Sequence, residues 1–201
     1  MTRQPTTSPT KSGMQSPSTS RSELRSRSRR RVVGTIAACA CHSALWLNGC
    51  SQEPDRPWKG SLFPKFALPT LDGVVHDIDQ YLGLPLLINF WATWCPPCRK
   101  EMGDLNALYG KLGPKGLELL AISVDTDRNL VREYLLHERL SFTVLIDDAQ
   151  QWSATALQLP GFPTTYLVGG DGVIREAWVG PRAWTDPALQ SAIASSVGLK
   201  Y

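Results

Sequence analysis

The sequence predicts an α/β fold in three layers, in which a central mixed sheet carries helices on both faces. The first observation is residues 86–91, a run that is apolar except for Asn89 and is typical of a strand buried on both faces. Residues 117–125 indicate a second buried strand, and between the two runs the apolar residues recur at helical spacing. The third observation is the turn at residues 170–172, Gly-Asp-Gly, which joins two further apolar segments as antiparallel strands.

Shorter elements complete the predicted domain, residues 61–201. The Asp72-Gly73 turn predicts a hairpin of two short strands, followed by a short helix over 77–82 that Gly83 ends. Beyond residue 125 we expect a helix over 127–140, a strand over 143–147, a helix over 152–159, a strand over 173–179 and a closing helix over 186–197. The apolar side chains expected to face inward are Leu130, Val131, Tyr134, Leu135 and Leu136 in the first of these helices, and Ala188, Leu189, Ile193 and Val197 in the last.

Charge is divided unevenly along the chain. Residues 1–50 hold eight Lys and Arg against one Glu, a net charge of +7, whereas residues 51–201 hold 13 basic against 17 acidic residues, a net charge of −4. The predicted domain is therefore mildly acidic, so the overall charge of +3 does not indicate nucleic-acid binding.

Residues 1–50 read as a disordered basic leader that ends in an export signal, and residues 51–60 as a short linker. Three arginines at 29–31 precede a mostly apolar run at 32–47, which is too short and too polar for a comfortable transmembrane helix. General secretion and twin-arginine export both fit this pattern. Residues 47–50, LNGC, resemble a lipoprotein cleavage box in which Cys50 is acylated. The alternatives are an uncleaved anchor and cleavage without a lipid, and on either path Cys39 and Cys41 have no redox role.

Cys95 and Cys98 stand where the strand over 86–91 gives way to a helix. With Cys95 as the N-cap, Pro96 and Pro97 take the first two helical positions, where a missing N–H is tolerated. The Cys95 sulfur then lies over the free N–H groups and the positive end of the helix dipole, which favour a thiolate, and Cys98 supplies the nearest donor. A thiolate with a second thiol one turn away can exchange disulfides.

Other roles for the cysteine pair are weaker. A structural disulfide across so small a loop constrains the unfolded chain little. Zinc needs two further ligands, yet no Cys follows Cys98, and His76 and His137 lie far off in sequence. Thiolates also bind Cu(I), so a Cu(I)-binding module remains the alternative function, although it has no obvious third ligand. An inactive scaffold on the same fold is a further alternative, against which the intact Cys pair argues. We expect no metal and no cofactor.

The motifs resemble a known family. Residues 90–98, FWATWCPPC, resemble the active site of thioredoxin-fold proteins, and residues 98–102, CRKEM, are similar to the TlpA-like and ResA-like group of membrane-anchored, extracytoplasmic thiol–disulfide oxidoreductases. The resemblance covers about residues 63–198. It implies a thioredoxin-like fold with an N-terminal hairpin and a central helix–strand insertion at about residues 126–148. One departure is Gly103, where the group usually has proline; glycine in a helix costs about 1 kcal/mol against alanine.

The resemblance also implies a second loop beside the cysteines. The segment PGFPTT at 160–165 is similar to the loop whose proline is cis in thioredoxin-like folds, which implies a cis bond between Phe162 and Pro163. In the family this loop, here continuing to Thr164, faces the cysteine pair and binds a substrate strand through its backbone. Trp94 is expected to shield Cys95 and to touch the substrate.

Two polar residues near the pair differ in what they imply. Asn89 stands where cytoplasmic thioredoxins have a buried aspartate, so that proton acceptor is missing. Glu101 matches a glutamate of the ResA-like group, and a carboxylate beside Cys98 would raise the pKa of that thiol and accept its proton. A solvated helix glutamate is the alternative.

The resemblance implies thiol–disulfide exchange at the periplasmic or other extracytoplasmic face of a membrane. We expect Cys95 to attack and Cys98 to resolve, with the pair acting as a reductant. The expected partners are disulfide-containing envelope proteins, namely apocytochrome c or copper-site assembly proteins of the respiratory oxidase, and a membrane electron donor of the CcdA/DsbD type. We expect a monomer held at the membrane through its N-terminal lipid or signal anchor.

Overall fold

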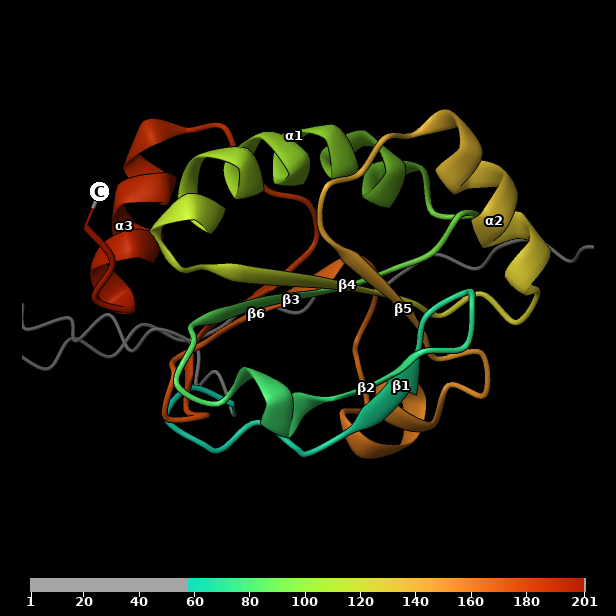
Figure 1. Cartoon of the computed structure of the whole chain (residues 1–201), viewed down its shortest axis with the longest axis horizontal. Coiled ribbons are helices and arrows are strands. Elements are labelled where there is room, and N and C mark those ends of the chain that lie inside the picture. The colour runs from blue at the N-terminus through green and yellow to red at the C-terminus, as the bar shows by residue number, and fades with distance from the viewer. Residues whose placement is uncertain (1–57, 201) are drawn as a thin grey trace, which may run out of the picture. The chain divides into compact units, whose positions relative to one another are not determined.

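The computed structural model describes residues 58–200 (Figure 1). The predictions for the leader, for Cys50 and for most of the linker lie outside these residues. Within residues 58–200, the search for an apolar helix of membrane-spanning length returned none.

A five-stranded mixed sheet forms the centre of the domain, with the strand order β5-β4-β3-β6-β7. Strands β3 (Leu86–Trp91), β4 (Glu118–Ser123) and β5 (Thr143–Ile146) run parallel. Strand β6 (Thr164–Val168) runs antiparallel to β3, and β7 (Ile174–Val179) antiparallel to β6. Every residue of β3 is buried, as expected for the middle strand of a sheet that is covered on both faces.

The predicted three layers are confirmed (Figure 1). Helices α1 (Pro96–Leu112), α2 (Arg128–His137) and α3 (Pro187–Ser196) lie on one side of the sheet, and the short segment η2 (Gly113–Lys115) follows α1. The other side carries the hairpin of β1 (Ala67–Pro69) and β2 (Val75–Asp77) with the short helical segments η1 (Ile78–Tyr81) and η3 (Gln151–Ala156). Ring contacts join this layer together, for example between Phe66 and Trp152, whose centroids are 6.1 Å apart. The second layer therefore consists of a hairpin and short helical turns.

The hairpin forms as the turn signal predicts. β1 and β2 pair antiparallel with Ala67 opposite Asp77, and Gly73 in the connecting turn has a φ of +87°. Only glycine adopts this conformation without steric cost, so the Asp72-Gly73 pair fixes the place where the chain reverses.

Helix α2 is shorter than predicted, and its apolar face is narrower. It ends at His137, because Glu138 is already extended, with φ −103° and ψ 116°. The prediction that Leu130 and Leu136 face inward is wrong: they are 46% and 77% exposed, and Val131 is the buried residue of the helix. In a leucine-rich helix several overlapping faces satisfy the same spacing, and packing selects one of them.

Two further helical predictions are corrected. The segment predicted as a helix over 152–159 is a π-helical turn over 151–156, held at its start by the Asp147 carboxylate, which accepts from the N–H of Trp152 and of Ser153. In α3 the inward face contains Gln190 beside Ile193, and Ala188 is exposed. Gln190 lies inward because its amide is bonded at both ends, to the Lys111 ammonium and to the Trp184 carbonyl.

Helix α1 continues through Gly103 from Pro96 to Leu112, and a Cβ atom added at Gly103 would meet nothing within 4 Å. We expect Gly103→Ala to raise the free energy of unfolding by about 0.5–1 kcal/mol, because alanine loses less backbone entropy on folding. Urea denaturation measures the change. Gly116, with φ +103°, is the contrasting position, where alanine is expected to destabilise the protein. A Gly103→Ala variant no more stable than the parent would contradict the helical assignment of this residue.

Candidate active site

The two cysteines lie at the N-terminus of α1, where β3 delivers the chain. Cys95 is the N-cap of the helix, and its Sγ accepts the N–H of Cys98 at 3.3 Å. Pro96 and Pro97 occupy the first helical positions, as predicted. The two sulfurs are joined in a disulfide, with the Cα atoms 5.3 Å apart. Cys98 is fully buried and Cys95 is 5% exposed, so a substrate can reach only Cys95.

The loop before β6 lies against the turn that carries Cys95. The Phe162–Pro163 bond is cis, which confirms the expectation. The Phe162 ring meets the Trp94 ring edge-on at a centroid distance of 5.8 Å, and Trp94 is 59% exposed. Thr164 is fully buried, and its hydroxyl donates to the Gly161 carbonyl at 2.7 Å. The exposed part of this loop is therefore aromatic, and Thr164 shapes it from inside.

Glu101 lies on the buried side of α1, one turn after Cys98. It is 3% exposed, which rules out the alternative of a solvated helix glutamate. Its Oε1 accepts from the Asn89 Nδ2 at 3.0 Å, and its Oε2 accepts from the Trp184 Nε1 at 3.0 Å and the Arg182 N–H at 3.2 Å. One carboxylate thus links α1, β3 and the loop that precedes α3.

Burial and hydrogen bonding act on Glu101 in opposite directions. Burial raises the pKa of its carboxyl group, because the charged form loses its hydration, while the bonds from Trp184, Arg182 and Asn89 lower the pKa by holding that charged form. Burial is the larger effect, so the pKa lies above its ordinary value of 4.5. A carboxyl group poised in this way exchanges a proton more readily near neutral pH than an exposed glutamate does.

Asn89 orients the carboxyl group from the middle strand. Its Nδ2 bridges Glu101 and the Thr165 hydroxyl, which lies 2.8 Å away in the neighbouring strand β6. Its Oδ1 has no hydrogen-bond partner among residues 58–200. Asn89 therefore supplies a donor to the site and no proton acceptor, as its identity predicted.

No hydrogen bond of Glu101 within the described residues goes to a cysteine sulfur. In the disulfide form neither sulfur carries a proton that could be shared. A groove of about 350 Å³ opens beside the pair and gives access to Glu101; it is lined by Pro96, Pro97, Lys100, Glu101, Asp104, Pro181 and Arg182.

The sequence gave no local sign of the partners of Glu101 in the loop before α3. Trp184 lies 83 residues away in sequence and is fully buried. A buried indole N–H requires an acceptor, and this requirement is the one signal that the sequence contained. The acceptor could not be identified before the fold placed the loop beside α1.

We expect Trp184→Phe to raise the pKa of Glu101 further, because the indole N–H that favours the charged carboxylate is lost. The effect is visible in stability. A carboxyl group with a raised folded-state pKa stabilises the protein fully below its unfolded value, and this contribution is lost as the pH rises through the folded pKa. In the variant the loss should extend to higher pH.

Urea denaturation across a pH series above 4.5 measures this shift. Trp178→Phe is the matched control, since Trp178 packs edge-on against Trp184 at 5.5 Å and is not among the donors to Glu101. Equal pH profiles for the two variants would contradict the role of the indole.

Comparisons with known proteins agree with this geometry. Residues 60–177 match the AhpC/TSA family. The chain is 30% identical over 150 residues to the thiol-disulfide oxidoreductase ResA of Bacillus cereus, an alignment that covers 75% of this chain and 86% of that protein. It is 35% identical, with the same coverage, to ResA of Bacillus thuringiensis. Among solved structures, a candidate thiol:disulfide interchange protein DsbE from Chlorobium tepidum is 30% identical with a TM-score of 0.60, covering 69% of this chain and 94% of that one.

Proposed function

The chain belongs to the AhpC/TSA family and is a ResA-like thiol–disulfide oxidoreductase, and on this premise we propose that its Cys95–Cys98 pair reduces disulfides of extracytoplasmic proteins. The observation that carries the proposal is the cysteine pair itself, in which Cys95 is both the N-cap of α1 and the more exposed sulfur. In the reduced protein the helix N-terminus stabilises a Cys95 thiolate, which is the attacking species in disulfide exchange.

The reaction moves two electrons from the protein to the substrate. The Cys95 thiolate attacks one sulfur of the substrate disulfide; a mixed disulfide forms, and the second substrate sulfur leaves as a thiolate. Cys98, after losing its proton, attacks the Cys95 sulfur, which forms the Cys95–Cys98 disulfide and releases the first substrate sulfur. The disulfide observed here is the state that follows this second step.

Glu101 is the proposed acceptor of the Cys98 proton. It lies on the same helix one turn on, is buried, and keeps a raised pKa. Water reaches it from the groove beside Pro97. Once the pair is reduced, the carboxylate is the nearest buried base on α1, and it takes the proton as the mixed disulfide resolves.

The substrate surface is proposed to be the aromatic face made by Trp94 and Phe162, with the backbone of the Pro163 loop. Trp94 is the exposed large apolar side chain next to Cys95, and its ring is held by Phe162. An extended segment on either side of a substrate disulfide can pair with the loop backbone, while the rings cover the reacting sulfurs.

The reaction is proposed to take place outside the cytoplasm, where protein disulfides persist. The basic and apolar leader supports export, and an acyl group at Cys50 would tether the domain to the membrane surface; mass spectrometry of the N-terminal peptide checks for the lipid. Clients in cytochrome c maturation or oxidase copper-site assembly, and a membrane donor of the CcdA/DsbD type that reduces the pair again, complete the proposal.

The Cu(I)-binding alternative uses the same two sulfurs. Within the described part of the chain no group of three or more His, Cys, Asp or Glu gathers as a metal site, so the pair has no third ligand of these types there. Titration of the reduced protein with Cu(I) distinguishes the two functions, because tight stoichiometric binding is expected only of a metal module.

Exchange of each cysteine separates the two steps. We expect Cys95→Ser to abolish reduction of a disulfide substrate such as insulin, and Cys98→Ser to accumulate a mixed disulfide through Cys95, since the resolving thiol is missing. Non-reducing electrophoresis and peptide mass spectrometry detect the adduct. Cys39→Ser is the control, because that leader cysteine has no expected redox role. Insulin reduction by the Cys95→Ser protein at the parent rate would refute the assignment.

Removal of the carboxylate tests the proton acceptor. We expect Glu101→Gln to lower kcat/KM for disulfide reduction by about 100-fold, the lower range for loss of a general base. Glu133→Gln, at an exposed carboxylate on α2, is the matched control and should retain full activity. A folded Glu101→Gln protein with the pH–rate profile of the parent would show that the Cys98 proton goes elsewhere.

A further inference from the structure

The turn that presents Cys95 is short. The Cys95 N–H donates to the Ala92 carbonyl at 3.2 Å, so Thr93 and Trp94 are the two central residues of a turn between β3 and α1. Any rotation of this turn displaces the Trp94 ring and the Cys95 sulfur together. The position of the reacting sulfur therefore depends on what holds Thr93.

Thr93 is held by a buried carboxylate from the neighbouring strand. Asp125 follows β4 by two residues and is 1% exposed. Its Oδ2 accepts from the Thr93 backbone N–H at 2.9 Å, and its Oδ1 accepts from the Thr93 hydroxyl at 2.6 Å. The Ser123 hydroxyl donates to Oδ2 at 2.8 Å and accepts the Asp125 N–H at 3.1 Å.

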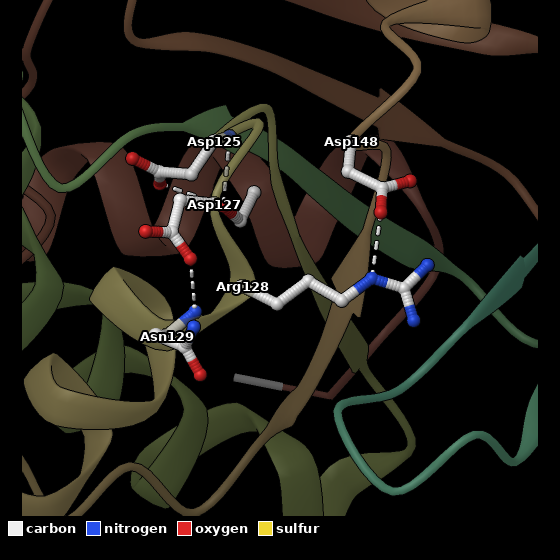
Figure 2. Close-up of polar contacts among 6 residues, drawn as sticks. Asp125, Asp127, Arg128, Asn129 and Asp148 are labelled. Carbon is white, nitrogen blue, oxygen red and sulfur yellow. Dashed lines mark hydrogen bonds and ion pairs between the residues drawn. The ribbon is translucent and has the colours of Figure 1, made fainter.

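The charged residues that follow Asp125 are engaged elsewhere. Figure 2 shows Asp125 at the end of β4, apart from the pair formed by Arg128 and Asp148. The Arg128 Nε donates to the Asp148 carboxylate at 2.6 Å, and Asp127 caps α2 by accepting the Asn129 N–H at 2.9 Å. The hydrogen bonds to the Asp125 carboxylate therefore come from neutral groups, two of them on Thr93.

Two donors on one residue require two acceptors. A carboxylate offers an acceptor oxygen to each, whereas an asparagine amide offers one oxygen and turns N–H donors toward the other partner. Burying a carboxylate among neutral donors costs free energy that an apolar residue would not. The arrangement is thus poorly suited to stability alone and well suited to fixing the orientation of Thr93.

We propose that Asp125 is a positioning residue for the reaction: by binding both donors of Thr93, it sets the turn that presents Cys95 and Trp94 to a substrate disulfide. The proposal rests on the attacking role assigned to Cys95 above. Asp125 acts through Thr93 and touches neither the sulfur nor the substrate.

A second buried aspartate provides a matched comparison. Asp147 follows β5 as Asp125 follows β4, is 2% exposed, and accepts the N–H groups of Trp152 and Ser153 at 3.2 and 2.8 Å. It therefore anchors η3 and not the cysteine turn. Asp147→Asn should destabilise the protein in the same manner as Asp125→Asn while leaving the reactivity of Cys95 unchanged.

The experiment uses the full chain in the reduced state. The rate of Cys95 alkylation by iodoacetamide is followed across pH by mass spectrometry of the peptide that contains Cys95, together with insulin reduction. We expect Asp125→Asn and Thr93→Val each to lower kcat/KM by about tenfold, as misplacement of a reacting group does. Both should also shift the pH midpoint of alkylation. Thr93→Ser keeps both donors and should stay within about twofold of the parent.

The double variant Asp125→Asn/Thr93→Val should be no slower than either single variant, because both remove the same linkage. Should Asp125→Asn fail to fold, Thr93→Val against Thr93→Ser still decides the matter. Unchanged alkylation and reduction in Thr93→Val, or equal losses in Asp125→Asn and Asp147→Asn, would overturn the proposal. Unreactive Cys95 in the parent protein would instead refute the proposed function.

Discussion

The structure depends on one placement, that of the Cys95 sulfur at the N-terminus of α1. The fully buried strand β3 fixes the point at which the chain emerges from the sheet, and two prolines start the helix at once. The first free N–H groups of the helix are then directed at the Cys95 sulfur, and the Cys98 N–H is already bonded to it. The same helix carries Cys98 on its buried side, one turn on. The order of reaction, attack by one sulfur and resolution by the other, follows from this difference in exposure.

The surroundings of the pair combine rigidity with one deliberate cost. Glu101 is buried where a charge is unfavourable, yet three donors hold it, and the balance leaves a carboxyl group whose pKa is raised. The donors come from β3 and from the loop before α3, so the proton acceptor is held in place by elements far apart in sequence. Asp125 does the same for the turn on the other side of Cys95. The site is thus bracketed by two buried carboxylates with different tasks, one to take a proton and one to hold a backbone.

The sequence predicted those parts of the site that are local. A strand, a Cys-Pro-Pro-Cys turn and a helix follow one another within 27 residues, and each leaves a pattern of its own at 86–112. The hairpin turn at Gly73 and the loop at Pro163 are local in the same sense. Contacts across the fold left no such pattern: Glu101 and Trp184 are 83 residues apart, and Thr93 and Asp125 are 32 apart. The inward faces of α2 and α3 were misjudged for a related reason, since leucine and alanine satisfied the helical spacing on more than one face and tertiary packing made the choice.

The most direct test of the account is a titration of the reduced protein, in which thiolate formation is followed by ultraviolet absorbance, with Cys98→Ser and Cys95→Ser variants to assign each step. The account predicts that Cys95 ionises well below the ordinary cysteine pKa of about 8.5, and that Cys98 ionises well above Cys95. Two thiols that both titrate near the ordinary value would contradict it, because the helix N-terminus would then have no effect on the sulfur that it caps.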